Sequence, residues 1–168
     1  MILSGKFYSF TKEYNTIRDH VAAPMLRKSF TLPRVPEKAE ITVTGLGFYV
    51  LFVNGKDITK GALAPYISNP DQIIYYDNYD VTPYLTEGEN VVGVMLGNGM
   101  QDEDTPVWDF VKNPFRSAPK FAIAFEADGK LLFEADGGFK GHASPITFDS
   151  LRAGERYDAR AEQPGWNA

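Results

Sequence analysis

The sequence predicts an all-β protein, an antiparallel β-sandwich of the jelly-roll type. Three observations lead to this fold class. Aromatic residues make up 14% of the 168 residues, with 15 glycines and 11 prolines, a composition that suits short strands joined by tight turns. Apolar runs with strand periodicity follow one another between turn signals, and helical periodicity is nearly absent. Roughly eight short strands at such spacing are typical of a sandwich or jelly roll.

The first half of the chain contains the clearest strand signals. A strand pattern begins at Met25, before two prolines interrupt it. Residues 39–47 then alternate apolar and polar side chains, as in a strand buried on one side. The apolar run of residues 48–53 indicates a central strand covered on both faces. The pair Asn54-Gly55 ends this run and favours a two-residue hairpin turn.

The second half continues the same pattern. The short apolar runs at residues 73–76 and 91–96 indicate further strands. Residues 121–134 predict a hairpin whose turn is Asp128-Gly129. A last strand is expected near residues 146–148. We interpret residues 101–117, which hold acidic residues, Trp108 and two prolines, as an irregular excursion.

The chain is expected to form one domain preceded by a short lead-in. A length of 168 residues fits one domain, and typical domains have roughly 100–200 residues. Residues 1–24 show no clear period, so we interpret them as a lead-in segment that packs against another part of the structure. Residues 25–168 are then the single β-sandwich domain.

Composition and charge exclude several classes of function. The absence of cysteine excludes disulfides, thiolate zinc sites and cysteine nucleophiles. The net charge is -5 and no run of lysine and arginine stands out, which argues against nucleic acid as a partner. No stretch approaches the roughly 18 apolar residues of a membrane span. Residues 1–15 lack the apolar core of a signal peptide, so a cytoplasmic protein is expected unless a signal was removed.

Three stretches carry a resemblance to a known family. They are AEITVTGLGFYVLFVNG (39–55), YYDNYDVTPYLTEGENVVGVMLGNGM (75–100) and PITFDSLRAGERYDARAEQPGW (145–166). In this order they resemble the N-terminal domain of bacterial α-L-rhamnosidases, while the VNG, DVT and GEN elements are also similar to galactose-binding-domain-like jelly rolls. The resemblance implies a piece of an inverting glycoside hydrolase that releases terminal L-rhamnose, with its acid and base on an α/α barrel elsewhere.

No helical array of barrel length occurs in this sequence, so we expect the chain by itself to be no enzyme. Its partners would be the catalytic and β-domains of the same polypeptide, in the bacterial cytoplasm or, after removal of a signal, in the periplasm or outside the cell. Glycoside hydrolysis needs two carboxyl groups about 5–9.5 Å apart. We interpret Glu87 and Glu89 as solvated turn charges, and Glu155 and Asp158 as members of structural ion pairs with nearby arginines.

Sugar binding by a sandwich needs an aromatic platform together with amides and carboxylates, and such residues tend to lie on loops. Asn98 is predicted either to bind sugar or to be a turn residue with positive φ. Trp108 is predicted either to bind sugar or to cover an edge of the core. The candidate carbohydrate-binding residues are Tyr75, Tyr76, Asp77, Asn78, Asn98 and Trp108.

The acidic residues after Asn98 suggest a weak candidate for a metal site. Calcium takes carboxylate, amide and carbonyl oxygens as ligands. Asp102 and Asp104 are candidate ligands, although their spacing is not that of an EF-hand loop, and a solvated loop is the alternative. No cofactor is required by the sequence.

Three functions are compatible with these observations. The first is a non-catalytic accessory domain that supports the hydrolase barrel and contributes to substrate recognition, which predicts large exposed apolar patches. The second is a carbohydrate-binding module for L-rhamnose or rhamnosides, with or without calcium. The third is a jelly-roll domain for protein interactions.

Overall fold

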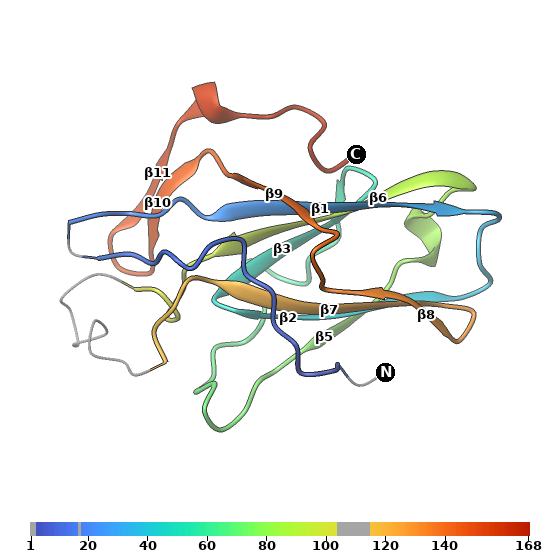
Figure 1. Ribbon diagram of the computed structural model, residues 1–168, viewed down its shortest axis with the longest axis horizontal. Coiled ribbons are helices and arrows are strands. Elements are labelled where there is room, and N and C mark those ends of the chain that lie inside the picture. The colour runs from blue at the N-terminus through green and yellow to red at the C-terminus, as the bar shows by residue number, and fades with distance from the viewer. Residues whose placement is uncertain (1–2, 17, 104–114) are drawn as a thin grey trace.

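A computed structural model describes residues 3–16, 18–103 and 115–168. Its described strands form two facing antiparallel sheets and a separate two-stranded hairpin (Figure 1). One sheet has the order β4-β3-β6-β1-β9, with β4 at Lys56–Asp57, β3 at Phe48–Val53, β6 at Gly88–Gly97, β1 at Pro24–Leu32 and β9 at Lys140–Ala143. The other has the order β5-β2-β7-β8, with β5 at Asp77–Asp80, β2 at Ala39–Leu46, β7 at Lys120–Ala127 and β8 at Lys130–Glu134. The predicted all-β antiparallel sandwich is confirmed.

The core lies between the two sheets, because alternate side chains of each strand point inward. In β2 these are Ile41 and Val43, which are fully buried, and Phe121 and Phe125 of β7 meet them from the neighbouring strand. The outer face of β2 differs from the expectation of a solvent-exposed side. Thr42 and Thr44 are only 1% exposed, and their hydroxyls donate to Oδ1 of Asn78 in β5 and to the Tyr75 carbonyl just before β5.

Strand β3 lies inside the five-stranded sheet, but the expectation that it is covered on both faces holds fully only for its inner face. It lies between β4 and β6, and its inward residues Tyr49, Leu51 and Val53 are fully buried. Its outward residues are half-buried, because the C-terminal part of the chain covers the outer face of this sheet only in part. The turn after β3 has the predicted left-handed conformation, with φ of 48° at Asn54 and 79° at Gly55.

The C-terminal part of the chain forms an additional layer on the outer face of the five-stranded sheet (Figure 1). It contains the hairpin of β10 (Ile146–Ser150) and β11 (Gly154–Tyr157), the short 3-10 helix η3 (Ala159–Ala161) and the final tail. Trp166 packs edge-on against Phe52, with ring centroids 5.3 Å apart. A Cβ on Gly93 would lie 3.1 Å from Cζ3 of Trp166, so the glycine lets the tail approach the sheet.

Among the described residues, the remaining regular element is the 3-10 helix η1 (Thr82–Tyr84) between β5 and β6. Thr82 is fixed there by a hydrogen bond from its backbone N–H to the Asp80 carboxylate, 3.0 Å long. No helix among the described residues is long and apolar enough to cross a membrane.

Candidate functional site

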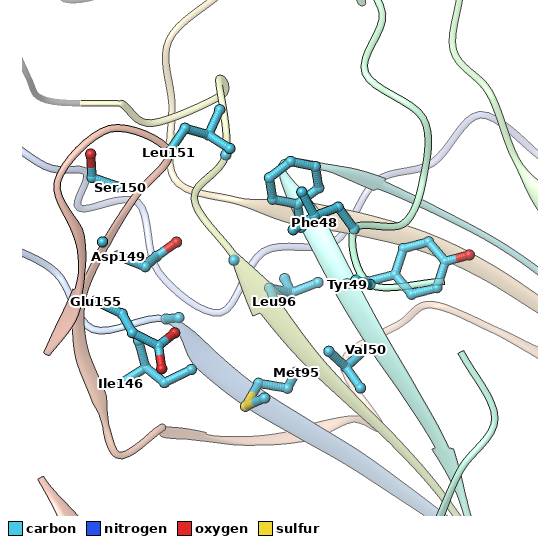
Figure 2. Close-up of a pocket in the computed structure, with 16 residues that line it drawn as sticks. Phe48, Tyr49, Val50, Met95, Leu96, Ile146, Asp149, Ser150, Leu151 and Glu155 are labelled. Atoms are coloured by element: carbon cyan, nitrogen blue, oxygen red, sulfur yellow. The ribbon is translucent and has the colours of Figure 1, made fainter. Parts of the chain in front are cut away.

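A pocket of about 270 Å³ opens on the outer face of the five-stranded sheet, beside the β10–β11 hairpin (Figure 2). Val50 of β3 and Met95 of β6 line its apolar side. The hairpin contributes Asp149 and Glu155, and the loop after β4 contributes Leu63. The pocket therefore combines apolar side chains of a sheet with carboxylates of a hairpin, and we call it the hairpin pocket.

Asp149 is positioned by Asn98, which follows β6 directly. The backbone N–H of Asn98 donates to Oδ2 of Asp149 over 2.7 Å, and its side-chain Nδ2 donates to Oδ1 over 2.5 Å. Burial raises the pKa of the Asp149 carboxyl, and the negative charges of Glu103 and Glu155 raise it further, although the Asn98 hydrogen bonds oppose this. The carboxylate is thus fixed in place but costly to ionise.

Asn98 itself is 1% exposed and does not have positive φ, so the expectation of a left-handed turn residue is wrong. Gly99 has the left-handed conformation instead, with φ of 51°. The buried Oδ1 of Asn98 has no hydrogen-bond partner among the described residues. The local role of Asn98 is to hold the β10–β11 hairpin against the end of β6.

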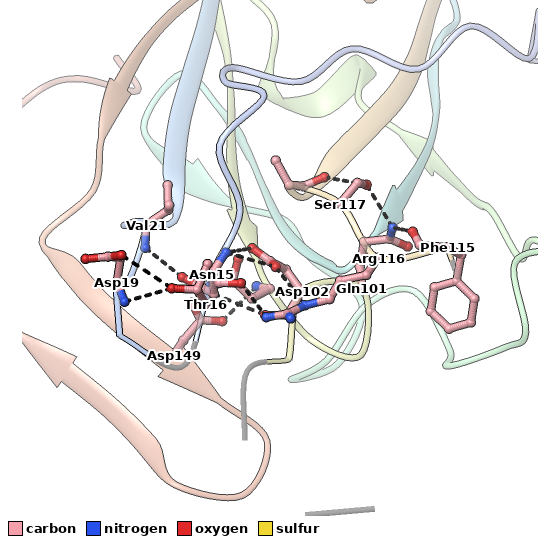
Figure 3. A network of polar contacts seen from close by, with 12 residues as sticks. Asn15, Thr16, Asp19, Val21, Gln101, Asp102, Phe115, Arg116, Ser117 and Asp149 are labelled. Carbon is pink, nitrogen blue, oxygen red and sulfur yellow. Dashed lines mark hydrogen bonds and ion pairs between the residues drawn. The ribbon is translucent and has the colours of Figure 1, made fainter. Parts of the chain in front are cut away.

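Two further buried carboxylates follow Asn98 in the sequence. Glu103 accepts hydrogen bonds of 3.0 Å from the Ser150 hydroxyl and from the backbone N–H of Leu151, so it holds the same hairpin. Asp102 accepts the backbone N–H of Asn15 with both carboxylate oxygens, at 3.1 and 2.9 Å (Figure 3). Arg116 completes this network, because it donates to the Asn15 carbonyl and its Nε lies 3.6 Å from Oδ1 of Asp102.

The two candidate metal ligands, Asp102 and Asp104, do not form a metal site among the described residues. Asp102 is 1% exposed and belongs to the network that fixes the lead-in segment, while Asp104 lies outside the described residues. Within the described part of the chain, no group of three or more histidine, aspartate or glutamate side chains could hold a metal ion.

The candidate carbohydrate-binding residues do not form one cluster. Tyr75 and Tyr76 are 48% and 55% exposed on the loop before β5. Asp77 accepts the Tyr49 hydroxyl over 2.6 Å, and Asn78 accepts the Thr42 hydroxyl over 2.6 Å, so both amide and carboxylate have structural partners. The Asn98 amide is bonded to Asp149 of the hairpin, and Trp108 lies outside the described residues.

The predicted ion pairs of the GERYDAR segment are formed only in part. Asp158 pairs with Arg160, with 2.7 Å between the nearest oxygen and nitrogen, and the neighbouring arginine lowers the pKa of the Asp158 carboxyl. Glu155 forms no ion pair with the described residues and lines the hairpin pocket. Arg156 lies over the ring of Phe148, 5.0 Å from its centroid, and not beside Glu155.

A second feature is the loop between β4 and β5, where sequence reasoning indicates a strand at residues 73–76 and the structure has none. Several large apolar side chains of this loop are between 38 and 84% exposed: Leu63, Tyr66, Ile67, Ile73, Ile74, Tyr75 and Tyr76. We call this set the loop face. The apolar run of residues 73–76 indicates a buried strand in the sequence, whereas its side chains are exposed on this loop in the structure.

Residues 34–168 match the family described as the alpha-L-rhamnosidase N-terminal domain. The chain belongs to this family. Curated relatives of this rhamnosidase N-terminal domain include α-L-rhamnosidases of Formosa agariphila, 31% identical over 94% of the chain, and of Streptomyces avermitilis, 29% identical over 88% of the chain. The chain spans only 18% and 15% of these relatives, less than a fifth of their length.

Solved structures agree with this assignment. The α-L-rhamnosidase from Dictyoglumus thermophilum superimposes with a TM-score of 0.79 and 30% identity, over 96% of this chain and 19% of that one. The Streptomyces avermitilis enzyme complexed with L-rhamnose gives a TM-score of 0.77 and 28% identity, over 88% and 15%. The predicted resemblance to a rhamnosidase N-terminal domain is therefore confirmed.

Proposed function

We propose that this rhamnosidase N-terminal domain is a non-catalytic accessory domain of a longer α-L-rhamnosidase-like hydrolase, in which the loop face packs against another domain. The observation that carries the proposal is the gathering of exposed apolar side chains on a single loop. Single exposed apolar residues are ordinary on a protein surface, but a contiguous group marks an interaction site. Tyr66, at 84% exposed, gains most by being covered.

The relatives support this choice of partner, since each continues far beyond the segment that matches this chain. A domain within a longer polypeptide buries apolar surface against its neighbours in interfaces like those between proteins. For this domain to support a catalytic domain, the loop face must be covered in the longer polypeptide. In the domain alone it is exposed.

The test compares two substitutions of equal exposure. Ile67 in the loop face is 50% exposed, and Leu131 on the edge strand β8 is 51% exposed. Ile67→Asp is expected to leave the thermal unfolding of the 168-residue chain unchanged but to lower the unfolding temperature of the longer polypeptide. Leu131→Asp is expected to leave both unchanged. Equal effects of the two substitutions in the longer polypeptide would show that the loop face is not the docking surface.

We also propose a second function, recognition of L-rhamnose or rhamnosides, because Tyr66 and Tyr75 line a shallow groove together with Met100. Exposed aromatic rings are the usual platform for the apolar face of a sugar. Calorimetric titration with L-rhamnose, with calcium and then with excess chelator, tests this function and its dependence on calcium. Saturable heat that disappears in Tyr75→Ala supports it, and the absence of heat in the unaltered chain rejects it.

A further inference from the structure

Two buried tyrosine hydroxyls connect the two ends of the loop that carries the loop face. Tyr49 of β3 is 1% exposed and Tyr79 of β5 is 4% exposed. We propose that Tyr49 is the positioning residue of the loop face, because its hydroxyl couples the end of this loop to its start. The use of this face in docking rests on the proposed function, whereas the hydrogen bonds themselves do not depend on it.

The hydrogen bonds form a chain with a single direction. The Tyr49 hydroxyl donates to Oδ2 of Asp77 over 2.6 Å, because a carboxylate only accepts. A tyrosine hydroxyl has one hydrogen, so Tyr79 is the donor in the 3.0 Å contact between the two hydroxyls. The Tyr79 oxygen in turn accepts the backbone N–H of Lys60 over 3.1 Å. Burial and the bond to Asp77 raise the pKa of Tyr49, so its hydroxyl keeps its hydrogen at neutral pH.

The two ends of this hydrogen-bond chain are also the two ends of the loop. Asp77 begins β5, Lys60 lies shortly after β4, and every member of the loop face lies between them in the sequence. Lys60 also donates from Nζ to the Asn78 carbonyl. The backbone N–H of Tyr49 donates to the Ala64 carbonyl over 2.8 Å. Tyr49 therefore holds both legs of the loop, one through its backbone and the other through its hydroxyl.

A fixed loop favours docking because its conformation is already set. Long loops without regular secondary structure are usually either functional or disordered. Ordering such a loop at the moment of contact would lower the affinity, and a loop that is ordered beforehand avoids this cost. A hydrogen bond to a carboxylate is about twice as strong as one between neutral groups. The bond from Tyr49 to Asp77 is therefore the link in the chain whose loss should release the loop most.

The experiment measures opening of the loop in the 168-residue chain by digestion with chymotrypsin, with the cleavage sites located by mass spectrometry. Tyr49→Phe removes the hydroxyl but keeps the buried ring. Cleavage after Tyr66, Tyr75 and Tyr76 is expected to become about tenfold faster, because the rate follows the population of the opened loop. Cleavage after Phe125, which is fully buried in β7, reports global unfolding, and its rate should change far less.

Variants of the acceptor separate this bond from other effects of the substitution. Asp77→Ala should accelerate loop cleavage as much as Tyr49→Phe does, and the double variant should be cleaved no faster, because both substitutions remove the same bond. Asp77→Asn keeps an oxygen that can accept the hydroxyl, so its loop should resist cleavage almost as well as that of the unaltered chain. Tyr157→Phe is the matched control. It removes a 2.8 Å bond from another tyrosine hydroxyl to a carboxylate, that of Glu162, and should leave loop cleavage unchanged.

Three results would overturn the inference: unchanged loop cleavage in Tyr49→Phe, equal acceleration after Phe125, or additive effects of Tyr49→Phe and Asp77→Ala. The first would show that the hydroxyl does not hold the loop. The second would assign it to global stability, and the third would show that the two residues act separately. If Ile67→Asp does not affect the longer polypeptide but loop cleavage behaves as expected, docking is rejected and the positioning of the loop stands. The reverse outcome rejects the positioning alone.

Discussion

Substitution of Asn54 tests whether the side-chain hydrogen bonds of the turn after β3 stabilise the sandwich. Its side-chain Nδ2 donates to the Tyr84 carbonyl and to Oδ1 of Asn90, both over 2.8 Å. Its Oδ1 accepts the backbone N–H of Val91 over 2.8 Å. These bonds connect the β3–β4 turn with η1 and with the start of β6, and the backbone of Asn54 is left-handed.

The free energies follow from this geometry. Asn54→Gly keeps the left-handed backbone but removes the three side-chain hydrogen bonds, at about 1 kcal/mol each, so we expect a loss of about 3 kcal/mol. Asn54→Ala loses the same bonds and adds about 1 kcal/mol of backbone strain. In thermal unfolding the glycine variant should melt roughly 6–12 °C below the unaltered chain.

The free energy of unfolding of both variants is measured by urea denaturation, followed by far-ultraviolet circular dichroism. An unchanged dependence of this free energy on urea concentration shows that the unfolded state is the same. Both variants lose the same hydrogen bonds, so the difference between their free energies of unfolding gives the backbone strain of alanine in the left-handed conformation. A glycine variant within about 0.5 kcal/mol of the unaltered chain would refute the reasoning, because it would mean that water replaces the three bonds without cost.

Three further perturbations test other parts of the structure. Because burial raises the pKa of Asp149, ionisation of this group costs stability as pH rises from 3.8 through the raised folded pKa. The free energy of unfolding of Asp149→Asn minus that of the unaltered chain should therefore increase between about pH 4 and pH 7, and a constant difference would contradict this. Glu155→Gln should raise the free energy of unfolding of the chain alone by about 0.5 kcal/mol, measured in urea, whereas a loss would show that no repulsion exists. Gly93→Val should displace Trp166 and shift its fluorescence to longer wavelength in a Trp108→Phe background, and unchanged emission would show that the tail tolerates the side chain.

The sequence predicted those features that depend on short-range rules. Asn54-Gly55 and Asp128-Gly129 specify turns because asparagine, aspartate and glycine tolerate positive φ, and both pairs have it. The run of residues 48–53 specifies a strand, and the facing sheet buries its inward side chains Tyr49, Leu51 and Val53. Periodicity failed for residues 73–76, where the apolar side chains face outward on a loop.

The polar contacts of the candidate site were not predictable in the same way. Asn98 and Asp149 are 51 positions apart, and Asn15 and Asp102 are 87 apart. No local pattern marks such pairs, because their meeting depends on how the C-terminal hairpin and the lead-in segment lie over the sandwich. Asn98 and Asp102 stand out in the sequence by residue type and by position near glycines or other acids. These signals do not distinguish a ligand from a buried structural partner.

The three sequence stretches that carry the family resemblance meet around the hairpin pocket. Gly47 of the first has φ of 102°, and a Cβ there would overlap the carbonyl oxygen of Gly97 in the second. Asn98 of the second binds Asp149 of the third. The three stretches thus contain the contacts that hold the end of β6 between the start of β3 and the β10–β11 hairpin.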